Sequence, residues 1–238
     1  MAEYLKEFTA AILAGGLGTR LRPRIADRPK VLAPVGGRPY LTYLLDQLAA
    51  AGVRRAVLLT GYRAEQVRAV FGAGYAGMRL AYSAEPAPRG TGGALRHALP
   101  DISSPTCLLL NGDSYCDVPL SAFRDFHARR AADISLVLTR QDDCSRFGRI
   151  HVAPGGRVVR FEEKPQDGGP GWVNAGIYLI QRTLIEEIPP DRPLSLERDL
   201  LPGWLRGRLL CAFPCRGRFL DIGTPESYSR AEAFFASP

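Results

Sequence analysis

Long hydrophobic runs are missing from this sequence. None of its apolar stretches reaches the roughly 18 residues that a helix needs to cross a membrane. The first residues, Met-Ala-Glu-Tyr-Leu-Lys-Glu, also lack the basic region and apolar core of a secretory signal peptide. We therefore expect a cytoplasmic protein without a membrane partner.

Cysteine and histidine are few and scattered. The five cysteines include no Cys-x-x-Cys pair, and Cys211 with Cys215 has no second pair nearby that would complete a zinc site. The three histidines show no metal-ligand spacing. We interpret the cysteines as reduced thiols, partly in the core, and we find no Ser-His or Cys-His arrangement typical of nucleophilic catalysis.

Runs of like charge are also absent, although the chain has 31 basic and 24 acidic residues and a formal charge of +7. Nucleic-acid binders usually concentrate basic residues on one face or stripe, whereas the arginines here are interspersed with acids. A small anionic substrate explains the surplus of arginine equally well. We expect no nucleic-acid partner.

The first half of the chain alternates between strand-like and helix-like patterns. Strands are predicted at residues 8–13, 56–60, 78–83 and 106–110, and helices at 40–51, 63–71 and 92–98. Such alternation indicates a three-layer α/β fold with a mostly parallel, doubly wound sheet, which binds ligands at the carboxyl ends of its strands.

The second half has a different pattern. Extended segments at 134–139, 149–152, 158–161 and 173–180 are separated by turns rich in proline and glycine, which predicts a small β-rich extension. Thr224-Pro225 is typical of a helix start and predicts a terminal helix to about residue 235. At 238 residues and 46% hydrophobic content, the sequence fits one globular domain.

Three glycines follow the first predicted strand, in Gly15-Gly16-Leu17-Gly18-Thr19-Arg20. Glycine lets the backbone turn sharply and approach a ligand because it has no Cβ, and successive amides in such a turn form a concave anion site. Arg20 and Lys30 add positive charge nearby. The segment is predicted to bind phosphate, with a plain tight turn as the alternative.

Two known phosphate-binding motifs do not fit this glycine segment. A P-loop needs Lys-Ser or Lys-Thr after its last glycine, and neither follows here. The dinucleotide fingerprint starts correctly at Gly16 and Gly18 but has Leu21 in place of its third glycine. A dinucleotide-dependent oxidoreductase is therefore disfavoured.

Two aspartates follow short apolar runs. Asp113 ends Asn111-Gly112-Asp113, and Asp221 lies within Phe-Leu-Asp-Ile-Gly. Carboxylate oxygens are the hard ligands that Mg²⁺ prefers, together with water and substrate phosphates. The pair predicts a Mg²⁺ site; the alternative is that each aspartate caps a turn.

Polar residues of the second half are candidates for binding a second ligand. Lys164, in Phe-Glu-Glu-Lys-Pro, is a point charge suited to a phosphate. The neighbouring Glu163 can accept hydrogen bonds from hydroxyls, and Asn174 offers both a donor and an acceptor. A solvated strand end and a turn residue are the alternatives for Lys164 and Asn174.

The sequence resembles the sugar-1-phosphate nucleotidyltransferases. The resemblance rests on the ordered segments LAGGLGTRLRP, RPKVLAPVGGRP, RGTGGAL, NGD, FEEKP, VNAGIY and DIGTPE, and it runs from about Ala10 to Tyr228. It implies a nucleoside triphosphate and a sugar 1-phosphate as partners, Mg²⁺ as cofactor, and release of pyrophosphate after in-line attack of the sugar phosphate.

The resemblance also implies roles for individual residues. Nucleotide-binding residues would be Leu13, Ala14, Gly15, Gly16, Gly18, Thr19, Arg20, Lys30, Gly61, Gly90, Thr91 and Gly92. The sugar phosphate would contact Gly148, Glu163, Lys164 and Asn174, the metal would be held by Asp113 and Asp221, and the catalytic set would be Arg20, Lys30, Asp113, Lys164 and Asp221. Residues 1–130 would then form mainly the nucleotide half of a single domain, and residues 131–238 mainly the sugar-phosphate half.

Finer features resemble one branch of the family. The chain length, RGTGGAL, the segment Arg146-Phe-Gly-Arg149 and DIGTPESY are most similar to D-glycero-α-D-manno-heptose 1-phosphate guanylyltransferases. This implies GTP as the nucleotide. Mannose-1-phosphate guanylyltransferases, other hexose-1-phosphate nucleotidyltransferases and a noncatalytic regulatory relative are the alternatives, and a homo-oligomer is compatible with each.

Overall fold

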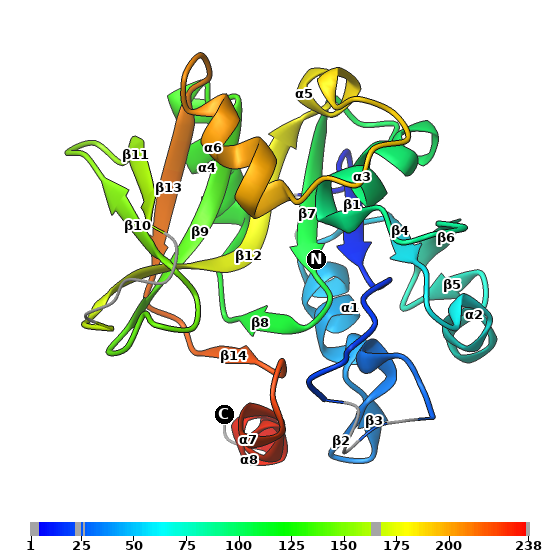
Figure 1. The fold of residues 1–238 in the computed structure, drawn as a ribbon. Helices are drawn as coiled ribbons and strands as arrows, with labels where there is room; N and C mark the ends of the chain where they lie inside the picture. Colours follow the sequence, from blue (N-terminus) through cyan, green and yellow to red (C-terminus); the bar gives the residue numbers. More distant parts are fainter. Residues whose placement is uncertain (1–4, 22–24, 26, 163–167, 237–238) are drawn as a thin grey trace.

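A mixed sheet of eight strands forms the centre of the protein. The computed structural model describes residues 5–21, 25, 27–162 and 168–236. At the middle of the sheet, β1 (Thr9–Leu13) pairs in parallel with β4 (Arg55–Thr60) and with β7 (Thr106–Asn111). These strands are almost entirely apolar and buried, as expected where helices cover both faces of a sheet. The strand order is β13-β9-β12-β7-β1-β4-β6-β5 (Figure 1).

Helices cover both faces of the sheet. Successive side chains of a strand point to opposite faces, and both faces carry apolar side chains that the helices bury. Ala10 and Ile12 of β1 belong to the hydrophobic cluster under α1 (Leu41–Ala50), α2 (Ala64–Phe71) and α4 (Leu120–Arg130). Ala11 belongs to the cluster under α3 (Gly90–His97), α5 (Arg182–Glu187) and α6 (Leu201–Trp204). The predicted three-layer α/β fold is confirmed.

The second half of the chain adds strands to the same sheet. Strand β12 (Gly171–Gln181) lies antiparallel between β7 and β9 (Ile134–Gln141), and β13 (Leu210–Cys215) extends β9 in parallel. Strands β10 (Arg149–Val152) and β11 (Val158–Glu162) form a hairpin separate from the large sheet. The predicted β-rich extension therefore consists of strands added to the sheet together with this small hairpin.

A short antiparallel ribbon lies below the carboxyl edge of the sheet in Figure 1. It pairs β8 (Ser114–Cys116) with β14 (Phe219–Asp221). The chain then enters α7 (Pro225–Ser229), whose start is capped by Thr224 as predicted, and α8 (Ala231–Ala236). The predicted single terminal helix is thus two short helices that meet at Arg230.

The remaining elements are short. They are β2 (Pro34–Val35), β3 (Arg38–Pro39), β5 (Gly74–Tyr75), β6 (Met78–Ala84) and the helical turns η1 (Lys30–Leu32), η2 (Leu99–Asp101) and η3 (Leu196–Leu200). Within the described ranges, every helix is too short or too polar to cross a membrane.

Candidate active site

The loops after β1, β4 and β7 meet at one edge of the sheet. The Ala14 amide donates to the Leu59 carbonyl at 2.8 Å, and the Gly112 amide donates to the Leu13 carbonyl at 3.0 Å, so the three strand ends are tied together. Gly112 is required here, because a Cβ at this position would lie 2.3 Å from the Leu13 carbonyl oxygen. These loops enclose a cavity of about 280 Å³.

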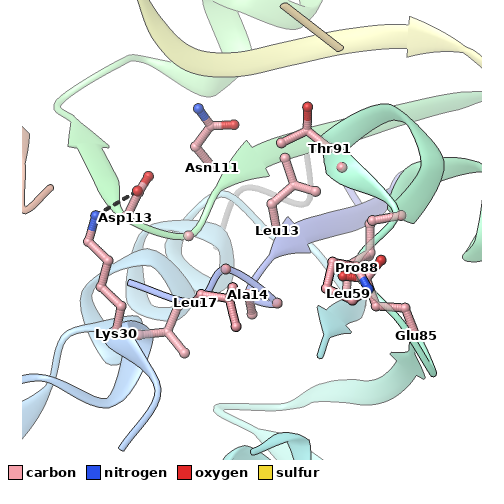
Figure 2. A pocket seen from close by; sticks show the side chains of 16 residues that line it. Leu13, Ala14, Leu17, Lys30, Leu59, Glu85, Pro88, Thr91, Asn111 and Asp113 are labelled. Atoms are coloured by element: carbon pink, nitrogen blue, oxygen red, sulfur yellow. Dashed lines mark hydrogen bonds and ion pairs between the residues drawn. The ribbon is translucent and has the colours of Figure 1, made fainter. Parts of the chain in front are cut away.

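The two ends of this cavity differ in chemistry. Figure 2 shows Lys30 and Asp113 at one end, and Glu85 with Pro88 at the other. Apolar side chains, among them Leu13, line the space between the two ends. One end therefore suits charged groups, and the remainder suits a flat ring with one polar edge.

Glu85 is held tightly at its end of the cavity. It follows β6, and its amide donates to the Thr60 carbonyl at 2.9 Å. A Cβ on Gly15 would lie 3.0 Å from Glu85 Oε1, and a Cβ on Gly61 would lie 3.2 Å from the same oxygen. The Arg89 amide donates to Glu85 Oε2 at 3.2 Å. Burial raises the pKa of the Glu85 carboxyl, although the Arg89 amide opposes the shift.

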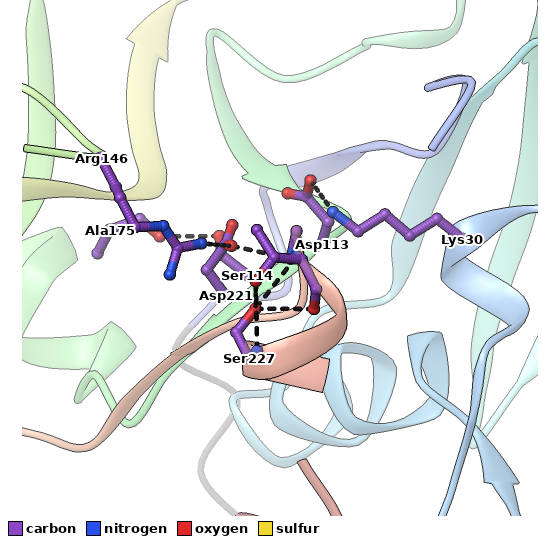
Figure 3. A network of polar contacts seen from close by, with 9 residues as sticks. Lys30, Asp113, Ser114, Arg146, Ala175, Asp221 and Ser227 are labelled. Atoms are coloured by element: carbon purple, nitrogen blue, oxygen red, sulfur yellow. Dashed lines mark hydrogen bonds and ion pairs between the residues drawn. The ribbon is translucent and has the colours of Figure 1, made fainter. Parts of the chain in front are cut away.

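The two predicted aspartates lie next to each other, because the β8–β14 ribbon aligns them. Asp221 pairs with Ser114 across the ribbon, and the Ile222 amide donates to the Asp113 carbonyl at 2.9 Å. Lys30 Nζ lies 2.7 Å from Asp113 Oδ2 (Figure 3). Burial and the neighbouring Asp113 charge raise the pKa of Asp221, while Lys30 lowers it.

This acid pair fits a hard divalent cation. The two carboxylates lie close enough to raise the pKa of one of them, and carboxylate oxygens are preferred Mg²⁺ ligands. Lys30 is paired with Asp113, and Arg146 Nη2 lies 3.7 Å from Asp221 Oδ1. No cluster of three or more metal-binding side chains exists among the residues that the structure describes. The two aspartates would therefore hold a cation only with further ligands from substrate phosphates and water.

Most of the predicted nucleotide-binding residues line the cavity. They are Leu13, Ala14, Gly15, Gly16, Lys30, Gly90 and Thr91, together with the predicted metal ligand Asp113. Gly18, Thr19 and Arg20 lie outside the lining. Arg20 Nη2 lies near Gly223, where a Cβ would be 3.4 Å from it.

Gly61 and Gly92 have other roles in the structure. Gly61 lies behind Glu85 and does not line the cavity. Gly92 faces away from it, because a Cβ there would lie 2.5 Å from Leu200 Cδ1. Both glycines are needed for close packing rather than for direct approach to a ligand in this cavity.

The predicted sugar-phosphate residues that the structure describes lie beside a second, smaller cavity. Gly148 and Asn174 line it, together with Glu162 and Glu197. Asn174 lies in an irregular stretch of β12, where the register with β9 shifts. Glu163 and Lys164 lie outside the described residues.

Several polar residues of the two cavities were not among the predicted site residues. Glu85 and Asn111 line the first cavity, and Arg149, Glu162 and Glu197 line the second. Glu85 and Asn111 stand at the carboxyl ends of predicted strands, which is the signal that identified Asp113. No comparable signal marks Glu197, which lies in the short turn η3.

Open α/β sheets bind their ligands outside the carboxyl ends of the strands, and the first cavity lies there, after β1, β4 and β7. The fold and this cavity define a ligand-binding α/β protein. Residues 9–237 match the family model described as "Nucleotidyl transferase", and the chain belongs to this family.

Relatives in the family include sugar-phosphate guanylyltransferases. The mannose-1-phosphate guanylyltransferase of Mycobacterium tuberculosis is 37% identical, but the match spans only 63% of its length and 94% of this chain. The D-glycero-α-D-manno-heptose 1-phosphate guanylyltransferase of Aneurinibacillus thermoaerophilus is 32% identical, over 94% of this chain and 96% of its own.

A solved structure agrees over the whole fold. The crystal structure of HddC from Yersinia pseudotuberculosis complexed with GMP-PN has a TM-score of 0.85 and 31% sequence identity. The match covers 96% of this chain and 99% of that chain.

Proposed function

We propose that this protein transfers a guanylyl group from GTP to D-glycero-α-D-manno-heptose 1-phosphate and releases pyrophosphate, with Mg²⁺ as cofactor. The observation that carries the choice of nucleotide is the position of Glu85. Its carboxylate closes the apolar end of a cavity whose other end holds Lys30 and Asp113.

A carboxylate at this position distinguishes guanine from other bases. Guanine presents a ring N–H and an exocyclic amino group side by side, and an ionised carboxylate has two oxygens that accept both. Adenine has an acceptor in place of that ring N–H, so it would leave a partly buried carboxylate oxygen without a donor. Leu13, Leu59 and Pro88 supply apolar walls for the ring.

The opposite end of the cavity would receive the triphosphate. Lys30 would neutralise the pyrophosphate leaving group, and Arg20, from the glycine-rich segment, would add positive charge at this end. Asp113 and Asp221 would hold Mg²⁺, which supplies charge neutralisation and alignment of the phosphates when bound. The residues thus act by positioning and neutralising charge, which suits direct attack of the sugar phosphate on the α-phosphorus.

The heptose is proposed from the segments RGTGGAL, Arg146-Phe-Gly-Arg149 and DIGTPESY, which resemble the heptose-1-phosphate guanylyltransferases. Two such enzymes are 32% and 34% identical to this chain. The mannose-1-phosphate enzyme is more similar in sequence, at 37% identity, which makes mannose 1-phosphate the second candidate.

Pyrophosphate release tests the proposal directly. Each nucleoside triphosphate is combined with the 1-phosphates of manno-heptose, mannose and glucose, with Mg²⁺ present. GTP with the heptose phosphate should give the highest kcat/KM. Glu85→Gln should lower kcat/KM for GTP by about 100-fold, because the amide repels one guanine donor. Glu65→Gln, at an exposed position of α2, should leave kcat/KM unchanged. Equal turnover of ATP and GTP would contradict the role of Glu85, and faster turnover of mannose phosphate would reassign the sugar.

A further inference from the structure

The segment that ends in η3 is fastened to the start of α3. The Leu194 carbonyl accepts hydrogen bonds from the amides of Gly92 at 2.8 Å and Gly93 at 3.2 Å, and the Leu194 amide donates to the Arg89 carbonyl at 2.9 Å. A Cβ on Gly90 would lie 2.6 Å from the Leu194 carbonyl oxygen. The glycines of RGTGGAL thus permit this close contact.

Glu197 extends from this segment to a position between the two cavities. Its Oε2 accepts hydrogen bonds from Thr91 Oγ1 at 2.9 Å and from Ser195 Oγ at 3.2 Å. Its Oε1 accepts from the Tyr178 hydroxyl at 3.2 Å. Tyr178 is fully buried, and its hydroxyl in turn accepts from Asn174 Nδ2 at 2.6 Å.

The direction of every hydrogen bond in this chain of contacts is determined. The Gly176 amide donates to Asn174 Oδ1 at 2.9 Å, so the Asn174 amino group must face Tyr178, and Tyr178 must donate onward to Glu197. On the other side, the Leu196 amide donates to Thr91 Oγ1 at 2.7 Å, which leaves the Thr91 hydroxyl proton for Glu197. Donors therefore approach the same carboxylate from both cavities.

We propose that Glu197 is a positioning residue that couples occupancy of the nucleotide cavity to the geometry of the sugar cavity. The coupling rests on the proposed function, which places GTP against Thr91 and the sugar phosphate against Asn174. A ligand that fixes Thr91 also fixes Glu197, and through Tyr178 it fixes the Asn174 side chain. The second ligand then meets an ordered site, and the coupling is the same in either order of binding.

Only a carboxylate at position 197 can accept hydrogen bonds from both Thr91 and Tyr178. An amide at position 197 has the same shape, but its amino group would face one of the two donors. The hydrogen bond on that side would then be lost. Glu197→Gln therefore separates coupling from the volume of the side chain. Asp199→Asn is the matched control, since Asp199 stabilises the same turn by accepting from the Ser195 amide at 2.6 Å without contacting Thr91 or Tyr178.

The test is calorimetric binding of α,β-methylene-GTP with and without the sugar 1-phosphate, which form no product together. In the unsubstituted protein each ligand should tighten the other by at least about 5-fold. Glu197→Gln should reduce this factor to about 1, whatever its effect on the affinity for each ligand alone, and Asp199→Asn should keep the coupling.

Four other outcomes overturn an assignment. Equal coupling in Glu197→Gln and in the unsubstituted protein rejects the role of Glu197, as does an unsubstituted protein that binds both ligands independently. Loss of coupling in Asp199→Asn as well would assign the effect to the turn as a whole. Failure of the unsubstituted protein to bind either ligand rejects the proposed function itself, and this inference with it.

Discussion

The Glu85 carboxyl is half-buried, and its raised pKa has a consequence for the pH dependence of binding. Guanine requires the ionised carboxylate, whereas the free protein takes up a proton at Glu85 at a higher pH than an exposed glutamate does. Affinity for α,β-methylene-GTP should therefore fall as the pH is lowered from neutral toward the ordinary carboxyl range. Calorimetry across this range should show the fall in the unsubstituted protein and in Glu65→Gln. A similar fall in Glu85→Gln would assign the titration to another group.

At Asp221, the ionised form that would hold a metal is also the form that destabilises the folded protein. Burial and the charge of Asp113 raise its pKa above the ordinary value of an aspartate, so the folded state binds the proton more tightly than the unfolded state. The free energy of unfolding then decreases as the pH rises through this window, and the ionised side chain is destabilising at neutral pH.

We expect Asp221→Asn to abolish turnover and to stabilise the metal-free protein at neutral pH. A gain of about 1 kcal/mol corresponds to roughly 2–4 °C in Tm for a chain of this size. Differential scanning calorimetry in EDTA measures it, with the exposed Asp142→Asn as a control that should leave Tm unchanged. A lower Tm for Asp221→Asn would mean that hydrogen bonds to the carboxylate outweigh the repulsion.

At the scale of elements, the irregular stretch of β12 depends on one glycine. Gly176 has φ of 76°, and a Cβ there would lie 2.7 Å from both Asn111 Nδ2 and Ser114 Oγ. Gly176→Ala should lower the free energy of unfolding by about 2 kcal/mol or more, because both the backbone and the packing are strained. Urea unfolding provides the measurement.

Gly203→Ala in α6 is the control for this substitution, because a Cβ at Gly203 meets no atom within 4 Å. Alanine should be neutral or mildly stabilising at that position, since it favours the helix more than glycine does. Equal stability of the two variants would show that β12 relaxes around the new methyl group.

The strands that form the first cavity were predictable, and several other elements were not. β1, β4 and β7 are apolar runs that end in glycine or asparagine turns, so their own sequences identify them. β13 contains Pro214 and lies at the edge of the sheet, where a missing amide hydrogen bond is tolerated. α4 is rich in charged residues, and only packing of residues such as Phe123 against the sheet identifies its buried face.

The site residues also divide into those that the sequence predicts and those that it does not. Asp113 and Lys30 were predictable because local motifs contain them. Glu85 stands at the carboxyl end of a predicted strand, but it precedes a proline as an ordinary turn residue does. Its placement depends on contact with Gly15 and Gly61, which follow β1 and β4. Glu197 depends on contact with Tyr178 of β12. These contacts are products of tertiary structure, and the local sequence does not indicate them.

At the scale of the whole molecule, one sheet supports both cavities, so a ligand that binds the folded state should stabilise the entire protein. At 100 times its Kd, GTP with Mg²⁺ should add about 2.7 kcal/mol, or roughly 5–10 °C in Tm. Thermal unfolding with GTP, ATP and EDTA tests this expectation. ATP should give a much smaller shift, and EDTA should reduce the effect of GTP. Equal shifts from GTP and ATP would contradict base recognition.

The β8–β14 ribbon joins two segments that are separated by about half of the chain. Closing so long a loop is entropically unfavourable and belongs to the late, non-local part of folding. Asp113 and Asp221 are therefore apart in any intermediate that has built only the first strands of the sheet. During refolding, recovery of catalysis should lag behind recovery of helical circular dichroism. The return of enzymatic activity would then report the last step of folding.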